Sequence, residues 1–406
     1  MRLYCILIVF LSYCHTLSAQ VNPNPLAGIP KNFKYKKEAE QFVFIQGGKF
    51  MSGLAMGYDS IDLPLGVNAE VKNVILNKYE VSNGEYRQFT KYVLDSIAHS
   101  LLGFAGIIDW NSNKLDPLML PQEERLYGRK KIDSKKIIYK FSNGDTVAVY
   151  PDTLVWIRDF VYTYNEPMTK HYFSHPSYKN YPVIGISARQ AAAFCDWKTN
   201  QWNAALEAVN SKLKITVRLP DAIEWEYASL QGLGAISNNT FDFNVFDKSQ
   251  TKLYQDPLTR KRNFYNKGYR YNFGRIDDPN GFVVKSYADD AFFYTAPCNA
   301  YNPDLKGFFN LHGNVAEWTT TTGCRYGLIP GNNVNALKEI EAEFPGSVYG
   351  KLSPEQVVTY FKQLTVIKGG HWESEPFYLQ SGVNQYFKPA EQHCYIGFRM
   401  AVSINN

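Results

Sequence analysis

Three helix-start signatures predict where helices begin in this chain. Most of its remaining length shows no such signal. In each signature, a Ser or Asp is followed three residues later by Glu or Gln. This is the capping box, in which the two side chains satisfy free backbone amides of the first turn. The boxes are Ser82 with Glu85, Ser187 with Gln190 and Asp221 with Glu224. Apolar residues then recur at spacings of three and four after Ser82, which predicts an amphipathic helix.

Between these helices the apolar runs are short and bounded by turn residues, which is typical of strands. We expect strands within 42–45, 50–51, 74–81, 154–157, 182–186, 366–372 and 395–401. The connections 101–181 and 241–290 are long and show little periodicity, and connections of this length are usually functional or interacting. Short strands, few helices and long connections predict a compact α+β domain with a high loop content.

The first 19 residues have the pattern of a signal peptide. Arg2 supplies a basic start, an apolar run follows, and small residues precede the cleavage point. A transmembrane anchor is disfavoured because the run is short and interrupted by polar residues. Lipidation at Cys14 is an alternative, although a tyrosine stands before it where a small residue is expected. Residues 20–39 are rich in Pro and Asn and then basic, which predicts an extended linker.

The composition excludes some classes of protein. Of 406 residues, 45% are hydrophobic and 15% aromatic, which suits a large buried core and not a disordered chain. The formal net charge of +5 is small for this length and no basic run accompanies it, so no nucleic-acid partner is expected. Four cysteines follow the predicted signal, and in an exported chain they allow up to two disulfides or buried free thiols. They are Cys195, Cys298, Cys324 and Cys394.

The stretch 307–319 combines oxygen-bearing side chains with a turn glycine. Asn310, Gly313 and Glu317 stand at offsets of three and four. Carboxylate, amide and backbone oxygens together are the ligands that calcium takes in proteins. The spacing is not that of an EF-hand loop, and a buried turn in which Asn310 and Glu317 satisfy backbone groups is the alternative. The residues by themselves leave both interpretations open.

Five separated motifs stand in a fixed order along the chain. They are Gly47-Gly48, Tyr79-Glu80-Val81-Ser82-Asn83, Arg218-Leu219-Pro220, Gly313-Asn314-Val315-Ala316-Glu317-Trp318, and Lys368-Gly369-Gly370 with Gly397-Phe398-Arg399. The ordered set resembles the formylglycine-generating-enzyme (sulfatase-modifying factor) family over about residues 40–402. The resemblance implies a loop-rich, C-type-lectin-like α+β fold. We therefore expect one domain at 40–403, with insertions at about 101–181 and at 323–365, the second containing two helices.

Within this family, the first insertion is similar to the GldK/PorK group, the gliding-motility lipoproteins of the type IX secretion system. The similar segments are 86–89, 95–98, 124–133, 150–160 and 164–169. Cys14 departs from the lipoprotein pattern of that group. The resemblance implies a structural subunit at the periplasmic face of the outer membrane, which forms a homo-oligomeric ring with a GldN/PorN-like partner. The two insertions are then the expected contact surfaces.

The resemblance also implies that the chemistry of the family is lost here. Its enzymes oxidise a substrate cysteine to formylglycine with a copper ion held by two cysteines, and soft thiolates suit Cu(I). The matching positions are Ser374 and Leu379, so we expect no enzyme and no copper. His371 and Glu373 stand nearby, but two ligands on one segment indicate an edge histidine and a solvated carboxylate rather than a metal site. An oxidase or a ligand-binding module of the same fold is the alternative.

The calcium ligands of the family, in contrast, are all matched. By resemblance, one site falls on Asn310, Gly313, Val315 and Glu317, with Gly313 and Val315 binding through backbone oxygens. A second site falls on Asn272, Phe273, Asp290 and Phe292. We refer to these as the Glu317 set and the Asp290 set. The resemblance implies structural calcium at both.

Overall fold

The computed structural model describes residues 26, 28–53, 67–160, 167–234, 245–255, 263–323 and 362–405. The predicted signal peptide and nearly all of the second insertion lie outside these residues. The α-helices are α2 (Lys36–Ala39), α3 (Asn83–Leu102), α4 (Val155–Asp159), α5 (Pro167–His171), α6 (Ala188–Ala208) and α7 (Ala222–Leu233). The strands are β1 (Phe42–Ile45), β2 (Gly48–Ser52), β3 (Val67–Val71), β4 (Val74–Asn77), β5 (Ile138–Lys140), β6 (Thr146–Ala148), β7 (Lys214–Arg218), β8 (Lys252–Gln255), β9 (Asn263–Asn266), β10 (Ile276–Asp277), β11 (Val283–Lys285), β12 (Ala316–Thr322), β13 (Thr365–Lys368), β14 (Gln385–Phe387), β15 (Ile396–Gly397) and β16 (Ala401–Asn405).

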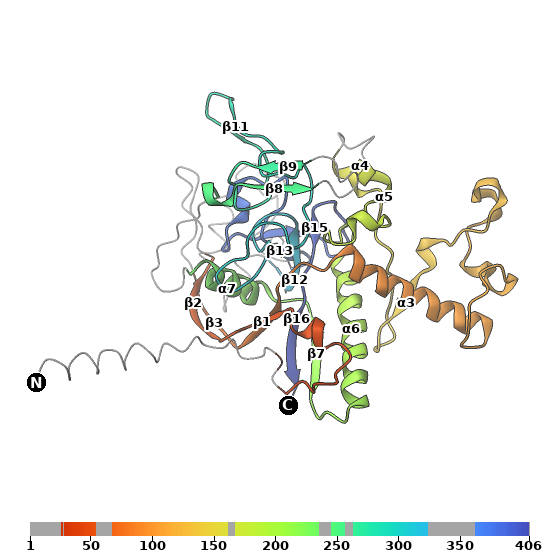
Figure 1. Cartoon of the computed structure of the whole chain (residues 1–406). Helices are drawn as coiled ribbons and strands as arrows, with labels where there is room; N and C mark the ends of the chain where they lie inside the picture. Colours follow the sequence, from red (N-terminus) through yellow and green to blue (C-terminus); the bar gives the residue numbers. More distant parts are fainter. Residues whose placement is uncertain are drawn as a thin grey trace, which may run out of the picture.

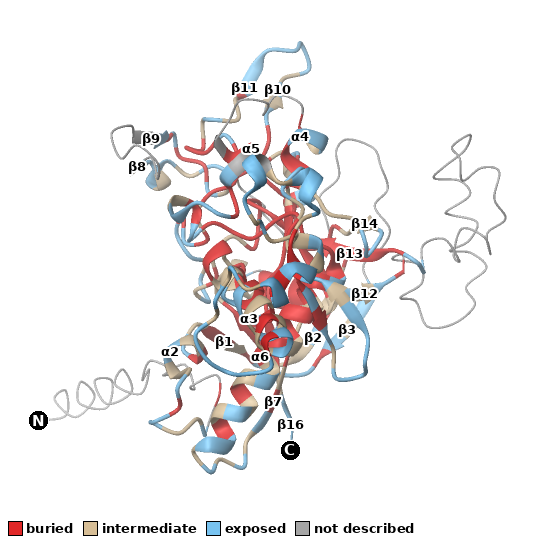
Figure 2. Cartoon of the chain, turned by 90° about the vertical axis from the view of Figure 1, so that its right-hand side faces the viewer, coloured by how far each residue is buried: buried red, intermediate tan, exposed pale blue. Residues whose placement is uncertain are grey.

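Two sheets form the centre of the described structure (Figure 1). One has the strand order β1-β4-β16-β7, and the other has the order β14-β13-β12-β15. The first is antiparallel throughout, and β16 lies in its interior between β4 and β7. In the second, β13 is buried at every position, and Figure 2 shows buried residues concentrated around β12 and β13. This central position fixes the residues at the start of β12.

The three predicted helix starts are confirmed. Ser82, Ser187 and Asp221 each accept a hydrogen bond from the third residue of α3, α6 and α7, and each box is closed by the return bond. α3 and α6 then meet through aromatic rings, with Tyr86 stacked on Phe194 at 5.6 Å between ring centroids. The sequence therefore fixes both the start of these helices and the faces that they bury.

Most of the predicted strands are confirmed, but two are wrong. Residues 183–186 are buried without forming a strand, because the left-handed Gly185 (φ +68°) interrupts the extended chain. Residues 154–157 contribute to helix α4 instead. The Asp152 carboxylate accepts a 2.8 Å hydrogen bond from the Leu154 amide, which turns the chain at this point. Trp156 then enters the core at 1% exposure.

The prediction of an extended linker at 20–39 is wrong for its second half. Leu26, Phe33 and Ala39 are buried in the main core. The ring of Phe33 packs edge-on against Trp202 of α6 at 6.0 Å. Residues 28–39 therefore belong to the folded domain. No helix within the described ranges is long and apolar enough to cross a bilayer.

The first insertion has a projecting middle and anchored ends. We call residues 103–133 the arm, which extends beyond the C-terminal end of α3 in Figure 1. The arm exposes Phe104 (52%), Ile107 (95%) and Tyr127 (90%). A small apolar cluster around Leu115 holds its base against α3. Further along the insertion, Trp156 packs in the core, 6.0 Å from the ring of Trp372.

Candidate functional site

The Glu317 carboxylate lies at the centre of the molecule and is fully engaged. Arg399 approaches it with Nε at 2.6 Å from Oε2 and with Nη2 at 2.6 Å from Oε1. Trp225 of α7 donates from Nε1 to Oε2 at 2.7 Å. The remaining Arg399 N–H groups reach the backbone carbonyls of Asn77, Lys78 and Phe309. Neither charged side chain is more than 1% exposed. This buried ion pair joins β12 to the C-terminal segment.

A second buried carboxylate, Glu80, lies beside this pair. It accepts from Asn310 Nδ2 at 3.1 Å and from Asn314 Nδ2 at 2.7 Å. Burial raises the pKa of Glu80 to about 8; the charge of Arg399 opposes this shift and that of Glu317 adds to it. Glu80 and Glu317 thus share one guanidinium, which leaves this cluster with more carboxylates than cations.

The two predicted ligand sets adjoin through Asn314, which stands between Gly313 and Val315 of the Glu317 set. Asn314 donates from its backbone amide to the Asn272 carbonyl at 2.8 Å, and Asn272 Nδ2 lies 3.3 Å from Asn314 Oδ1. Gly313 (φ +78°) makes this approach possible, because a Cβ there would lie 2.2 Å from the Asn272 carbonyl oxygen. Glycine is therefore required at 313 by both its conformation and its neighbour.

A lysine lies within the Asp290 set. Lys285 Nζ is 2.7 Å from Asp290 Oδ2, and both side chains are fully buried. The same nitrogen donates to the Phe273 carbonyl at 2.6 Å. Burial raises the pKa of Asp290 to about 6, with Lys285 opposing the shift. Burial likewise lowers the pKa of Lys285, with Asp290 opposing it.

The fit to calcium differs between the two sets. In the Asp290 set, Asn272 Oδ1 is buried without a hydrogen-bond partner in the described structure, as a bound cation or water would require. However, the ammonium of Lys285 takes two of the four expected oxygens, those of Phe273 and Asp290, so this set does not fit calcium. In the Glu317 set, both oxygens of Glu317 already accept from Arg399 and Trp225, and Glu80 adds a second carboxyl group beside them. Within the described ranges, no three His, Cys, Asp or Glu side chains group as metal ligands, and calcium stays a prediction.

Sequence reasoning located the expected ligands but not their partners. Glu80 and Arg399 belong to motifs that carried the family resemblance, so a signal for them was present. Asn314 likewise stands within the central motif. Lys285 lies in a connection without periodicity, and no pattern in the sequence indicates its contact with Asp290.

The positions that match the two copper-binding cysteines are enclosed. Leu379 is completely buried and packs with Tyr269 and Phe273. Ser374 is 5% exposed, its hydroxyl accepts from the His371 amide at 3.0 Å, and its carbonyl accepts from the Gly274 amide at 2.8 Å. The segment at 269–274 thus covers both positions.

The expectation of an edge histidine at 371 is wrong. His371 is buried and its ring stacks on Tyr395, with 4.2 Å between centroids. Its Nδ1 faces the backbone amide of Glu373 at 3.3 Å, and burial lowers the pKa of His371 to about 3. This histidine is therefore a neutral core residue.

The cysteines in the described ranges are free thiols. Cys195, Cys298 and Cys394 are all buried, while Cys324 lies outside the described residues. Burial raises the pKa of each of the three thiols, so the reactive thiolate is suppressed.

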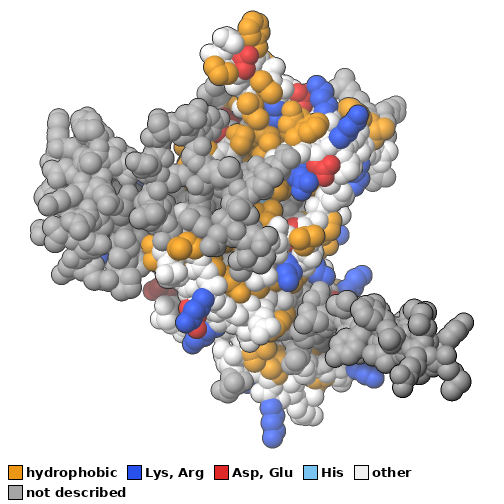
Figure 3. Space-filling view, turned by 90° about the vertical axis from the view of Figure 1, so that its left-hand side faces the viewer, with side chains coloured by type: hydrophobic (Ala, Val, Ile, Leu, Met, Phe, Trp, Pro, Cys, Tyr) orange, Lys and Arg blue, Asp and Glu red, His pale blue; other side chains and the backbone are white. Residues whose placement is uncertain are grey.

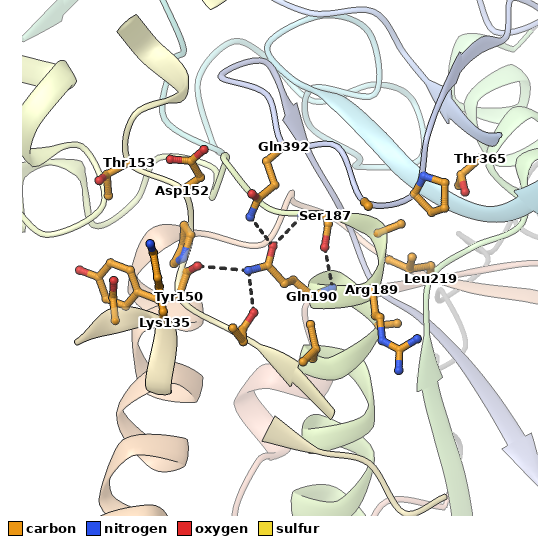
Figure 4. Close-up of a pocket in the computed structure, with 18 of the residues that line it drawn as sticks. Lys135, Tyr150, Asp152, Thr153, Ser187, Arg189, Gln190, Leu219, Thr365 and Gln392 are labelled. Atoms are coloured by element: carbon orange, nitrogen blue, oxygen red, sulfur yellow. Dashed lines mark hydrogen bonds between the residues drawn. The ribbon is translucent and has the colours of Figure 1, made fainter. Parts of the chain in front are cut away.

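A cavity of about 1140 Å³ lies between β6, α6 and the segment around Gln392 (Figure 4). Gln190 forms part of its wall and bonds the carbonyls of Ala148 and Tyr150 at 2.9 and 3.1 Å. Its Oε1 accepts from Gln392 Nε2 at 2.8 Å. The eight expected calcium ligands, all within the described residues, do not line this cavity. The side chain of Gln190 therefore holds the wall of the cavity together through hydrogen bonds to its neighbours.

Comparison with known proteins agrees with this architecture. The family model described as "Sulfatase-modifying factor enzyme 1-like domain" matches residues 29–404. The formylglycine-generating enzyme of Mus musculus is 28% identical over 141 residues, which are 35% of this chain and 27% of the mouse protein. The inactive C-alpha-formylglycine-generating enzyme 2 of Mus musculus is 27% identical over 143 residues, 35% of this chain and 32% of that protein.

The chain thus matches only about a third or less of these curated relatives. Among solved structures, PvdO from Pseudomonas aeruginosa aligns with a TM-score of 0.45 at 15% identity, covering 89% of this chain and 93% of that one. Because the family model spans nearly the whole chain, and the α+β architecture agrees with it, this protein belongs to the sulfatase-modifying factor enzyme 1-like domain family.

Proposed function

We propose that this protein is a non-catalytic structural subunit of the type IX secretion and gliding machinery, associated with the periplasmic face of the outer membrane. The observation that carries the loss of catalysis is the enclosure of Ser374 and Leu379. Neither side chain binds Cu(I), and the segment at 269–274 closes the space above them. On this proposal, a substrate cysteine does not reach these positions.

The similarity to a relative described as inactive supports the same conclusion. This mouse protein is 27% identical over 143 residues, so similarity to formylglycine-generating enzymes does not by itself imply their activity. The specific role in secretion rests on the resemblance of the first insertion to the GldK/PorK group. Ring formation and a GldN/PorN-like partner are part of the proposal on that ground.

The arm is the best candidate for the contact surface. Phe104, Ile107 and Tyr127 are 52%, 95% and 90% exposed and all lie on the arm, so the arm offers apolar side chains to a partner. Residues 150–160 resemble the GldK/PorK group more closely, but Trp156 and Val155 are buried at 1% exposure. That segment therefore serves the fold, and the partner surface is assigned to the arm.

Co-purification from the native envelope tests this assignment. The double variant Ile107→Asp/Tyr127→Asp places charge on the arm without touching the core. We expect it to lose the GldN/PorN-like partner and the large assembly while keeping the wild-type melting temperature. The matched control is Leu305→Asp, at a 79% exposed position outside the arm. Equal recovery of the partner with the arm variant and with the control would reject the arm as the contact surface.

Metal analysis and a peptide assay distinguish the rival oxidase. A structural subunit retains no copper or iron and leaves a cysteine-containing peptide unchanged. Near-stoichiometric copper with conversion of the peptide cysteine to an aldehyde would establish the oxidase instead.

Calcium at the Glu317 set is part of this proposal. The cluster holds Glu80 and Glu317 against Arg399, and Asn310 lies beside Glu80. A hard cation bound to oxygens here would stabilise the ionised form of Glu80, whose pKa burial raises to about 8, and would stiffen a fold with few regular backbone ladders.

A further inference from the structure

We propose that the ammonium of Lys285 is the structural cation of the Asp290 set and stands in place of the calcium ion expected there. The proposal concerns the fold and does not depend on the function proposed above. It rests on the oxygens around Nζ, the aromatic rings against it, and the charge balance of the buried cluster.

Four oxygens surround the ammonium. Lys285 Nζ lies 2.6 Å from the carbonyl of Phe273 and 3.1 Å from that of Gly274. It lies 2.7 Å from Asp290 Oδ2 and 3.2 Å from the carbonyl of Ser286. A lysine ammonium has three N–H donors and no acceptor, so this shell of oxygens satisfies it completely.

Aromatic rings complete the shell where calcium would need more oxygen. The ammonium lies 4.3 Å from the centroid of the Phe273 ring and 5.3 Å from that of Tyr269. Such contacts stabilise an organic cation, whereas calcium takes six to eight oxygen ligands. The surroundings are therefore those of an ammonium ion.

The buried charges also balance with Lys285 alone. Asp290 and Lys285 are both fully buried and form a neutral pair. The neighbouring Asp289 pairs separately with the exposed Lys267 at 2.8 Å. Adding a divalent cation to the Asp290 set would leave two uncompensated positive charges in the interior, which is strongly unfavourable. The free Asn272 Oδ1 suits a buried water, which satisfies single polar groups in protein cores.

The position of Lys285 gives the ammonium a mechanical role. It ends β11, while Phe273 and Gly274 lie shortly before β10, so the ammonium joins both sides of the β10–β11 hairpin to Asp290. The hairpin forms the protrusion at the top of Figure 3, where hydrophobic side chains gather at the tip. Phe282, Val283 and Val284 are 72%, 51% and 59% exposed.

Calcium content and thermal melting test the proposal on the full chain. Wild type, Asp290→Asn, Lys285→Met and the double variant are equilibrated with calcium, and bound calcium is counted by native mass spectrometry. We expect Asp290→Asn to hold as much calcium per chain as wild type. Lys285→Met should melt several degrees lower in calcium and in EDTA alike, because a buried carboxylate has lost its partner. The double variant should fall by less than the sum of the single shifts.

Lys267→Met is the matched control, since it removes an exposed lysine from the neighbouring pair, and it should melt like wild type. Loss of one calcium ion per chain in Asp290→Asn would overturn the proposal, as would additive shifts in the double variant. If Lys285→Met does not fold, the number of calcium ions bound by wild type and by Asp290→Asn still tests whether calcium occupies the Asp290 set.

Discussion

Buried charge in this protein is held by specific partners at the residue scale. The two carboxylates expected to bind calcium, Asp290 and Glu317, each face a buried basic side chain. Removing one member of such a pair typically costs about 3–5 kcal/mol, because the other charge is left in the interior. The fold therefore depends on these two ion pairs, which lie at the positions where the sequence indicated a metal.

Acid sensitivity is predicted for His371. Its pKa in the folded protein is about 3, against 6.5 without the fold, because burial disfavours the charged ring. Between about pH 3 and pH 6.5, His371 is protonated in the unfolded chain but neutral in the folded protein. The contribution of His371 to the free energy of unfolding is therefore complete above about pH 6.5 and falls as the pH drops toward 3. At pH 5 this loss is about 2 kcal/mol.

The variant His371→Gln has no titratable group at this position. In urea unfolding at pH 7 and pH 5, wild type should lose about 2 kcal/mol more than the variant between the two pH values. The exposed His175→Gln should follow wild type. If the free energy of unfolding falls equally with pH in wild type and in His371→Gln, His371 does not contribute to the acid sensitivity.

The partners of the site residues lay beyond sequence reasoning for a physical reason. Arg399 meets Glu317 across 82 residues of chain, and such a contact is set by sheet pairing rather than by local spacing. Lys285 is close to Asp290 in sequence but lies in an irregular connection, where side-chain direction has no period. The positions of the acidic residues were predictable, and Arg399 stood in a recognisable motif, but the pairing of each carboxylate with its cation was not predictable.

At the scale of elements, local capping was reliable and strand propensity was less so. The boxes at Ser82, Ser187 and Asp221 depend on neighbouring atoms only, and the structure has all three. Val155 and Trp156 have strand-forming side chains, yet they lie in α4. Packing of Trp156 against Trp372 decides this conformation, and it joins segments that are far apart in the sequence.

Helix α4 is predicted to anchor the first insertion. Trp156 is 1% exposed and packs against Tyr172 and Trp372 at 5.3 and 6.0 Å. Trp156→Ala should lower the free energy of unfolding by about 3–5 kcal/mol through the cavity that it leaves. Ile157→Ala, the next residue and 44% exposed, should change it by less than about 0.5 kcal/mol. Urea denaturation of both variants measures the difference, and similar losses would contradict the anchoring role.

At the scale of the whole molecule, calcium at the Glu317 set predicts a chelator effect. A ligand that binds only the folded state stabilises it by about 2.7 kcal/mol at 100 times its Kd. EDTA should therefore lower the melting temperature, and added calcium should restore it. Glu317→Gln should lose this response while Asp290→Asn keeps it. An unchanged wild-type melting curve with EDTA would remove calcium from the Glu317 set.

The fold class of the whole molecule was predictable because its motifs are local and ordered. Gly313 shows why such motifs carry information: its left-handed conformation and its contact with Asn272 exclude other residues. The inclusion of Phe33 in the core was not predictable, since its partner Trp202 lies on α6. Composition near the N-terminus indicated a linker, and tertiary packing overrode it.

The interior position of β16 has a consequence for how the domain is made. Its neighbours β4 and β7 come from distant parts of the chain, and each has an open edge until β16 is inserted. Open edges invite pairing with other molecules, and closure through distant segments is slow. The first sheet is therefore completed only when β16 pairs with both strands, and until then the open edges of β4 and β7 favour association between chains.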